Sequence, residues 1–392
     1  MPPEESRSPN TRLHHTYGCA IQHVVKLIAH LKLQPTPEQA DALLRTLETA
    51  NAACTSISHM AWNMQTFGKF DIQKVCYDHI RSTFPLSAQV VIRCIGKVAD
   101  AYKLYKGGRR AFKPHGAVPY DDRILSWNMH EPSVSIWTIN GRQSIPFVCG
   151  KRQWELLQTR HGETDLVYIK GQFYLLAVCA VEEPTPDDVE GVLSVDLGIT
   201  NIATDSDGET HFGADVDRVR ARYHLRRKRL QSVGTKNSRR RLRQLSGRQA
   251  KFQKDTNHRI AKQLVAKAQH TKRTIALEDL KGIRERARVR GKQQRARHAN
   301  WSFGQLRTFI DYKARLAGVT VVLVDPAYTS QACNRCGCVD KRNRPTQSTF
   351  CCVSCFHKAP ADYNASLNIR DRAAVIQPMA SNRRVQVQAA DL

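Results

Sequence analysis

The sequence lacks any run of about 18 or more consecutive apolar residues, the length that a membrane-spanning helix requires. It also lacks the apolar core of a secretory signal, because residues 1–17 are polar and contain several prolines and serines. No internal repeat of the length typical of solenoid proteins is present. On these absences we expect a protein without transmembrane helices that stays in the cytoplasm and has no membrane partner.

Acidic residues are scarce relative to basic ones. The 392 residues include 61 Lys or Arg and 35 Asp or Glu, which gives a net charge of +26. Such an excess favours binding to nucleic acid, because neutralising phosphates releases counterions. A charge kept only for solubility is the alternative. An apolar content of 41% is enough for packed cores, and the length suggests two or three domains.

Half of the twelve cysteines lie between positions 333 and 355. Two pairs have ligand spacing, and 15 residues separate them: Cys333-x2-Cys336 and Cys352-x2-Cys355. This spacing predicts a structural zinc ribbon in which four thiolates bind one Zn²⁺. Three further residues complicate the ligand set: Cys338, Cys351, which competes with Cys352, and the spare ligand His357.

Three acidic residues stand where an apolar strand ends or a helix begins: Asp196, Glu278 and Asp362. Taken singly, each is more typical of a cap or a turn. Together, in a basic domain, they would suit two Mg²⁺ ions about 4 Å apart, because hard cations prefer carboxylate oxygens. Asp279 competes with Glu278, since neighbouring strand residues point to opposite faces. Asp325 is interpreted as a turn residue.

The basic residues are concentrated in two stretches. From Arg218 to Arg273 there are 20 Lys or Arg and one acid, which predicts long helices with a cationic face. A solvated face is the alternative. A second run, 281–297, follows Glu278 and is expected to be a mobile loop that admits a nucleic-acid strand. The candidate nucleic-acid contacts are Arg226, Arg227, Lys228, Arg229, Arg239, Arg240 and Arg241, with Lys106, Arg109, Arg110 and Lys113 as guesses for reading DNA.

The order of predicted elements changes along the chain. A strand at 21–33 is followed by a helix with Thr36 as N-cap, and then by further helices to 105. Short strands with hairpin signals at Asn140-Gly141 and Lys170-Gly171 follow. After a polar, Pro-rich linker, strands and helices alternate in an order typical of a mixed α/β sheet. The fold class is therefore multidomain α/β.

Four sequence motifs in this order resemble the TnpB (OrfB) family of transposon-encoded RNA-guided nucleases, which are related to miniature type V CRISPR effectors. The resemblance covers nearly the whole chain and is strongest from Asp196 to Ile369. The motifs are Val195-Asp196-Leu197-Gly198, Leu277-Glu278-Asp279-Leu280-Lys281, Thr329-Ser330-Gln331-x-Cys333-x2-Cys336-Gly337 with Phe350-x-Cys352-x2-Cys355, and Asp362-x-Asn364-Ala365.

The resemblance implies a β-barrel-like wedge domain with an inserted helical recognition domain, then an RNase H-like (RuvC) domain with an inserted zinc ribbon. Asp196, Glu278 and Asp362 would be its catalytic acids and would bind two Mg²⁺. The expected boundaries are a disordered leader at 1–17, wedge at 18–34 and 106–182, recognition insertion at 35–105, linker at 183–189, RuvC at 190–328 and 358–374, ribbon at 329–357 and a disordered tail at 375–392.

The implied activity is RNA-guided DNA endonuclease cleavage beside a short adjacent motif. The implied partners are a guide RNA, derived from a transposon end or of CRISPR type, and double-stranded target DNA, and the location would be the prokaryotic cytoplasm, at the nucleoid when bound. The sequence does not decide between a monomer and a dimer. Two positions depart from the family pattern, Pro360 and Phe356, where relatives often carry Asp and Gly. The alternatives are a nuclease-independent RNA-guided regulator, a transposase accessory protein and a strand-joining transposase.

Overall fold

The computed structural model describes residues 24–186, 189–281 and 303–390, with side chains up to position 376. The predicted leader, and the basic run beyond Lys281, lie outside the described residues. The chain divides into two compact units, Met1–Glu182 and Glu183–Leu392. Among the helices of the described ranges, none combines the length and apolar character needed to cross a membrane.

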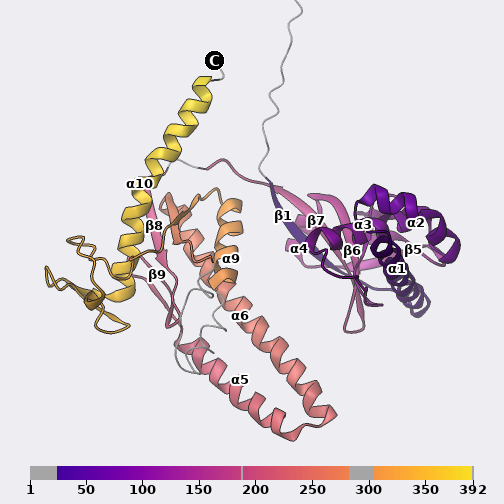
Figure 1. Ribbon diagram of the computed structural model, residues 1–392, viewed down its shortest axis with the longest axis horizontal. Coiled ribbons are helices and arrows are strands. Elements are labelled where there is room, and N and C mark those ends of the chain that lie inside the picture. Colours follow the sequence, from indigo (N-terminus) through magenta and orange to yellow (C-terminus); the bar gives the residue numbers. More distant parts are fainter. Residues whose placement is uncertain (1–23, 187–188, 282–302, 391–392) are drawn as a thin grey trace, which may run out of the picture. The chain divides into compact units, whose positions relative to one another are not determined.

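The first unit contains a seven-stranded sheet in the order β2-β6-β7-β1-β5-β4-β3. Figure 1 labels four of these strands, β1, β5, β6 and β7. The first strand, β1, pairs with β7 along most of its length and with β5 at its end. Both predicted hairpin turns are confirmed, with Gly141 and Gly171 in the left-handed region. The strands are β1 (Val24–Leu33), β2 (Val118–Tyr120), β3 (Leu125–Asn128), β4 (Ser133–Thr138), β5 (Gly141–Val148), β6 (Arg160–Ile169) and β7 (Gln172–Glu182).

Three helices between β1 and β2 pack with this sheet around one apolar core: α1 (Pro37–Asn63), α2 (Lys69–Thr83) and α3 (Ala88–Leu104). The predicted N-cap is confirmed, because Thr36 accepts from the Gln39 backbone N–H while the Gln39 side chain accepts from the Thr36 N–H. This reciprocal pair satisfies two amides that would otherwise lack partners at the helix start. The sequence did not indicate the short helix α4 (Lys151–Leu157).

The second unit is built on a five-stranded mixed sheet in the order β10-β9-β8-β11-β12. Helices α6 and α9 cover one face of this sheet through one apolar cluster, and α10 covers the other face through a second cluster around Ile369. The elements are β8 (Gly191–Asp196), β9 (Asn201–Asp205), β10 (Thr210–Phe212), α5 (Ala214–Val233), α6 (Lys236–His270), β11 (Arg273–Glu278), α9 (Phe303–Leu316), β12 (Val321–Val324) and α10 (Ala361–Ala390).

A small segment between β12 and α10 carries the cysteine pairs. It contains the short 3-10 helix η1 (Lys341–Asn343) and a two-stranded sheet of β13 (Thr349–Cys351) and β14 (Lys358–Pro360). The last helix of the described residues is α10, which runs from Ala361 to Ala390 and includes Pro378. The disordered tail expected from 375 stays a prediction.

Candidate functional site

Three acidic side chains line one cavity of about 260 Å³ in the second unit. Asp196 ends β8 and Glu278 ends β11, and these strands are parallel neighbours with Val195 opposite Leu277. Because parallel strands end at the same sheet edge, both acids reach that edge together. Asp362, in the first turn of α10, supplies the third carboxylate from the helix that covers the sheet.

The backbone after Asp196 turns too tightly for a side chain at the second following residue. A Cβ on Gly198 would lie 2.5 Å from the Asn201 carbonyl oxygen, so glycine is required there. The Asp196 side chain is half-buried at the wall of the cavity. Its partial desolvation, followed by repulsion from Glu278 and Asp362, raises the pKa of Asp196 well above the usual range. A cation bound in the cavity would relieve this repulsion.

The structure shows which of two adjacent acids, Glu278 at the end of β11 or Asp279 just after it, lines the cavity. Glu278 lines the cavity and accepts a hydrogen bond from the Thr329 hydroxyl. Burial raises its pKa, and the Thr329 bond opposes that rise. Asp279 instead bonds Arg307 at 2.8 Å, and this pairing lowers the pKa of Asp279. Glu278 is therefore the acid of this pair that belongs to the cavity.

Both oxygens of Asp362 have partners that come from elsewhere in the unit. Asn201 donates to Oδ2 at 2.9 Å, and Arg344 donates to Oδ1 at 3.1 Å. Arg344 belongs to the cysteine segment, which also supplies Gln347 to the cavity wall. Each carboxylate oxygen has a second lone pair, so both oxygens of Asp362 can still bind a metal ion.

Asparagines of α10 fix the cysteine segment against the acid cavity. The Asn364 side chain donates to the Ala332 carbonyl at 2.8 Å and accepts from the Asn334 amide at 3.1 Å. Asn368 donates to the Thr329 and Ala332 carbonyls at 2.8 Å. These bonds hold Thr329 beside Glu278 and explain the amide at Asn364, two residues after Asp362.

Cys333, Cys336, Cys352 and Cys355 form a compact cluster whose ligand atoms all lie within 4.8 Å of one another. Within the described part of the chain, no other group of three or more Cys, His, Asp or Glu side chains is this compact. The Sγ atoms are 3.7 Å apart for Cys333 and Cys355 and 3.6 Å apart for Cys336 and Cys352. A tetrahedral zinc ion with Zn–S bonds of about 2.3 Å requires sulfur separations of about 3.8 Å, so the four thiols fit zinc.

The remaining candidate ligands stay outside this cluster. Cys338, Cys351 and His357 are not part of it, which favours Cys352 over Cys351 as the x2 spacing did. The Cys355 and Ser354 backbone N–H groups point at Cys352 and lower the pKa of that thiol to about 6, whereas the pKa values of the neighbouring Cys333 and Cys336 thiols are raised.

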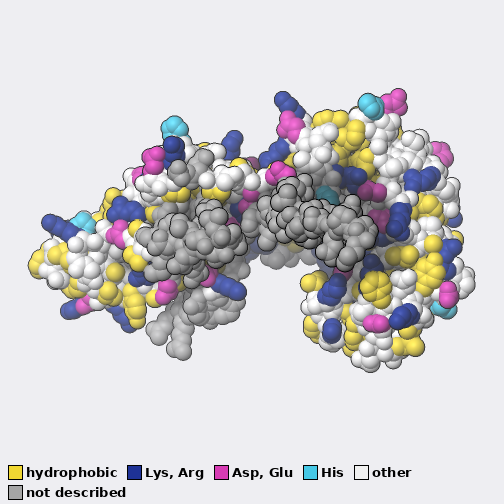
Figure 2. All heavy atoms as spheres, turned by 90° about the horizontal axis from the view of Figure 1, so that it is seen from above, with side chains coloured by type: hydrophobic (Ala, Val, Ile, Leu, Met, Phe, Trp, Pro, Cys, Tyr) yellow, Lys and Arg dark blue, Asp and Glu magenta, His cyan; other side chains and the backbone are white. Residues whose placement is uncertain are grey.

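The predicted basic helices are α5 and α6, and most of their arginines face solvent. Arg226, Arg229, Arg241 and Arg248 line a groove of about 420 Å³ between the two helices. Lys228, Arg239 and Arg240 are also exposed. Arg227 differs, because it is half-buried and donates to Gln249 at 2.8 Å, which gives it a structural partner. Figure 2 shows Lys and Arg side chains, interspersed with acids, on the visible face of each unit.

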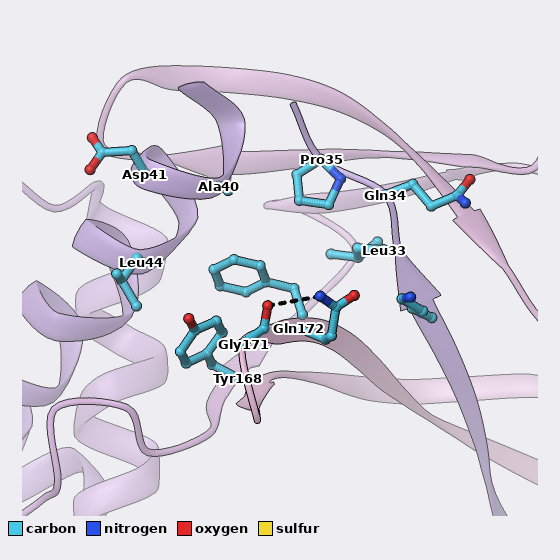
Figure 3. A pocket seen from close by; sticks show the side chains of 11 residues that line it. Leu33, Gln34, Pro35, Ala40, Asp41, Leu44, Tyr168, Gly171 and Gln172 are labelled. Atoms are coloured by element: carbon cyan, nitrogen blue, oxygen red, sulfur yellow. Dashed lines mark hydrogen bonds between the residues drawn. The ribbon is translucent and has the colours of Figure 1, made fainter. Parts of the chain in front are cut away.

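The first unit has a separate cavity of about 370 Å³ at the junction of β1, α1 and the β6–β7 hairpin. Figure 3 shows Leu33, Pro35, Leu44 and Tyr168 around it, with Gln172 bonded to the Gly171 carbonyl. Its walls are mixed polar and apolar, and Asp41 is the one acidic residue among those that line it. The guessed DNA-reading residues lie elsewhere. Lys106 and Arg110 lie 5.9 and 4.8 Å from the ring centres of Phe67 and Tyr105, and Arg109 and Lys113 are exposed.

Sequence reasoning missed three residues that hold the acids in place: Asn201, Thr329 and Arg344. Thr329 stands within a motif that was recognised, although its contact with Glu278 spans 51 positions. Arg344 is one of several basic residues in its segment, and nothing in its sequence context distinguishes it. Such partners become visible only when the sheet, the cysteine segment and α10 are assembled.

Comparison with known proteins matches residues 303–369 to the family model "Cas12f1-like, TNB domain". The chain is 42% identical over 127 residues to a CRISPR-associated endodeoxyribonuclease Cas12f1 of Sulfoacidibacillus thermotolerans, covering 32% of this chain and 28% of that protein. It is 28% identical over 218 residues to the putative RNA-guided DNA endonuclease InsQ of Escherichia coli K12, covering 51% of this chain and 53% of InsQ. The chain thus spans between a quarter and about half of the length of these two relatives.

Similarity in fold extends further than similarity in sequence. A Cas12f1 chain solved in a complex with sgRNA and target DNA aligns with a TM-score of 0.59 at 14% identity, covering 84% of this chain and 82% of that one. A TnpB-like protein of Methanocaldococcus jannaschii is 30% identical over 196 residues, which is 47% of this chain and 69% of that protein. This coverage and the shared motifs show that the chain belongs to the TnpB-like protein family.

Proposed function

We propose that this protein is an RNA-guided DNA endonuclease that hydrolyses phosphodiesters at the cavity of Asp196, Glu278 and Asp362. The observation that carries the proposal is the convergence of these three acids, from two strand ends and one helix start, in a chain of net charge +26. Repulsion among partly buried carboxylates is costly unless a cation shares the site. The similarity to relatives that are named as endonucleases supports the proposed activity.

In this proposal the second unit is an RNase H-like domain of RuvC type. Asp196, Glu278 and Asp362 would hold two Mg²⁺ ions, which would supply the Lewis acidity that phosphodiester hydrolysis needs. Thr329 orients Glu278 through its hydroxyl, and Asn201 and Arg344 orient Asp362. The guanidinium of Arg344 also offers positive charge at the cavity wall, where a phosphate would lie.

The remaining parts would hold the nucleic acids. The sheet and helices of the first unit would act as wedge and recognition domains for the guide RNA and for a short motif beside the target. The arginine groove between α5 and α6 would contact phosphates, since its sign and exposure suit sequence-independent binding. The cysteine segment would bind one Zn²⁺ and keep Arg344 in place.

A purification followed by cleavage tests the proposal. The gene is expressed with its native downstream DNA, and RNA bound to the purified protein is sequenced. A single structured RNA with a variable end is expected, and the complex should cut matching DNA with Mg²⁺. Asp196→Ala should lose cleavage and retain RNA and target binding. Full cutting by this variant would refute the acid assignment, and absence of specific RNA would favour an unguided transposase or DNA-binding protein.

A further inference from the structure

The two cysteine knuckles share one backbone design. In the first, the Cys333 N–H donates to the Cys338 carbonyl at 2.9 Å and the Gly337 N–H donates to the Cys333 carbonyl at 2.8 Å. In the second, the Cys352 N–H donates to the His357 carbonyl at 2.9 Å and the Phe356 N–H donates to the Cys352 carbonyl at 3.1 Å. Gly337 and Phe356 therefore occupy equivalent positions.

This position requires a left-handed backbone. Gly337 has φ +76° and Phe356 has φ +59°. Glycine adopts this region freely, whereas an L-residue with a Cβ is strained there. A glycine at 356 would complete the knuckle with less strain, so folding does not explain the phenylalanine.

Packing does not explain it either. The Phe356 side chain is 75% exposed, and the exposed apolar residues Val353 and Val339 belong to the same two knuckles. Because the Phe356 ring is exposed to water, it contributes little hydrophobic stabilisation to the fold. Its Cβ also makes the left-handed backbone at this position unfavourable. Phe356 combines a strained backbone with an exposed aromatic ring, and backbone strain of this kind is concentrated at sites that contact a ligand or partner.

The surroundings identify the chemistry of that partner. Residues 329–357 contain four basic residues and one acid, Asp340, which already pairs with Arg342 at 2.7 Å. The same segment sends Arg344 to the acid cavity. Phe356 stands six residues before Asp362, so the two are separated by no more than about 20 Å of extended chain. A basic segment that carries an exposed ring and reaches the carboxylate cavity through Arg344 suits an unpaired nucleotide, because phosphates meet the charge and a base stacks on the ring.

We propose that Phe356 is a base-stacking residue that positions the DNA strand bound at the acid cavity. The inference rests on the proposed function and goes beyond it, since it assigns a substrate contact to a position where the knuckle favours glycine. Removing the ring should leave the zinc cluster intact and impair only the placement of the strand.

The test uses the full chain with its guide RNA, carrying Asp196→Ala so that DNA stays uncut. Target duplexes carry 2-aminopurine at successive positions, and stacking on an aromatic ring quenches its fluorescence. We expect quenching at one or a few positions, loss of that quenching with Phe356→Gly, and retention with Phe356→Trp. In the cleaving background, Phe356→Gly should lower the single-turnover rate about tenfold with unchanged target affinity, since one stacking contact is sufficient for such a factor.

Two controls separate stacking from structure. Phe356→Gly should retain zinc and keep or raise the thermal midpoint because strain is relieved, whereas a structural role predicts a lower midpoint. The double variant Gly337→Phe with Phe356→Gly moves the ring to the other knuckle, where a Cβ meets no atom within 4 Å. It should not restore quenching at the original positions.

Unchanged fluorescence and unchanged cleavage by Phe356→Gly would overturn the inference. The fluorescence readout does not need cleavage, so an inactive wild type would count against the proposed function while the quenching still decided the stacking. A lower thermal midpoint with zinc loss in Phe356→Gly would assign the ring a structural role and also overturn the inference.

Discussion

Arg344 of the cysteine segment donates to the Asp362 carboxylate of α10 at 3.1 Å, across 18 positions of sequence. This bond joins the predicted zinc ribbon to the third acid of the cavity. The Arg344 guanidinium orients the Asp362 carboxylate and compensates its negative charge. Arg344→Ala should therefore lower the cleavage rate about ten- to a hundredfold. Arg344→Lys should recover only part of this loss. Steady-state cleavage rates at saturating Mg²⁺ check the prediction, and wild-type rates in Arg344→Ala would contradict it.

Glu278 and Asp279 offer a matched pair of adjacent acids. Glu278→Gln should abolish cleavage, because the cavity loses a ligand charge while the Thr329 contact can persist. Asp279→Asn should cleave at nearly the wild-type rate, since Asp279 is paired with Arg307 outside the cavity. Equal losses in the two variants would show that the cavity has been assigned to the wrong face of β11.

The cysteine cluster predicts coupled loss of metal and stability. Cys333→Ser should release zinc and lower the thermal midpoint, because four thiolates define the site and three bind more weakly. Cys351→Ser, just outside the cluster, should retain one zinc per chain. Zinc is measured by metal analysis of the dialysed protein. A stable, active Cys333→Ser protein without zinc would refute the ribbon assignment.

Lys267 of α6 neutralises the buried Asp205, with their charged atoms 2.5 Å apart. Lys267→Met would leave the buried Asp205 carboxylate without its cationic partner, which should lower the free energy of unfolding by roughly 3–5 kcal/mol. Lys262→Met, at an exposed position of the same helix, should have almost no effect. Chemical denaturation of the wild type and both variants measures these differences.

The contribution of Lys267 should also have a defined pH dependence. Burial lowers its pKa, but hydrogen bonds to Asp205, Asp207 and Glu209 outweigh this and raise it above the ordinary 10.5. A raised folded pKa means that the stabilisation is complete below 10.5 and is lost only as pH rises through the folded value. The difference between wild type and Lys267→Met should therefore stay constant from neutral pH up to that limit. A difference that shrinks between neutral pH and 9 would contradict this expectation.

Local signals in the sequence accounted for much of the fold. Thr36, the two hairpin glycines and the apolar strand runs each act on near neighbours, so their effect can be read from a short window. The order of strands could not be read this way. That β1 lies between β7 and β5 depends on contacts spanning more than 100 positions.

The candidate site divides in the same manner. Asp196, Glu278 and Asp362 stood out because each adjoins an apolar strand or opens a helix within a short recognisable motif, although their catalytic role stays a prediction. Asn201, Thr329 and Arg344 carry no such local signal, since ordinary polar residues fill many loops. The cysteine ligands were predictable from spacing alone, while the strain at Phe356 required the backbone angles.

The position of Asp362 in α10 has a consequence for biosynthesis. The ribosome completes the sheet and helices of the first unit, and then β8 and β11, before it adds the last carboxylate of the cavity. A nascent chain can thus fold its proposed guide-binding unit while it still lacks the means to cut DNA. Premature termination anywhere before α10 would leave a protein without the third acid, and under the proposed function such a truncated product could not cut DNA.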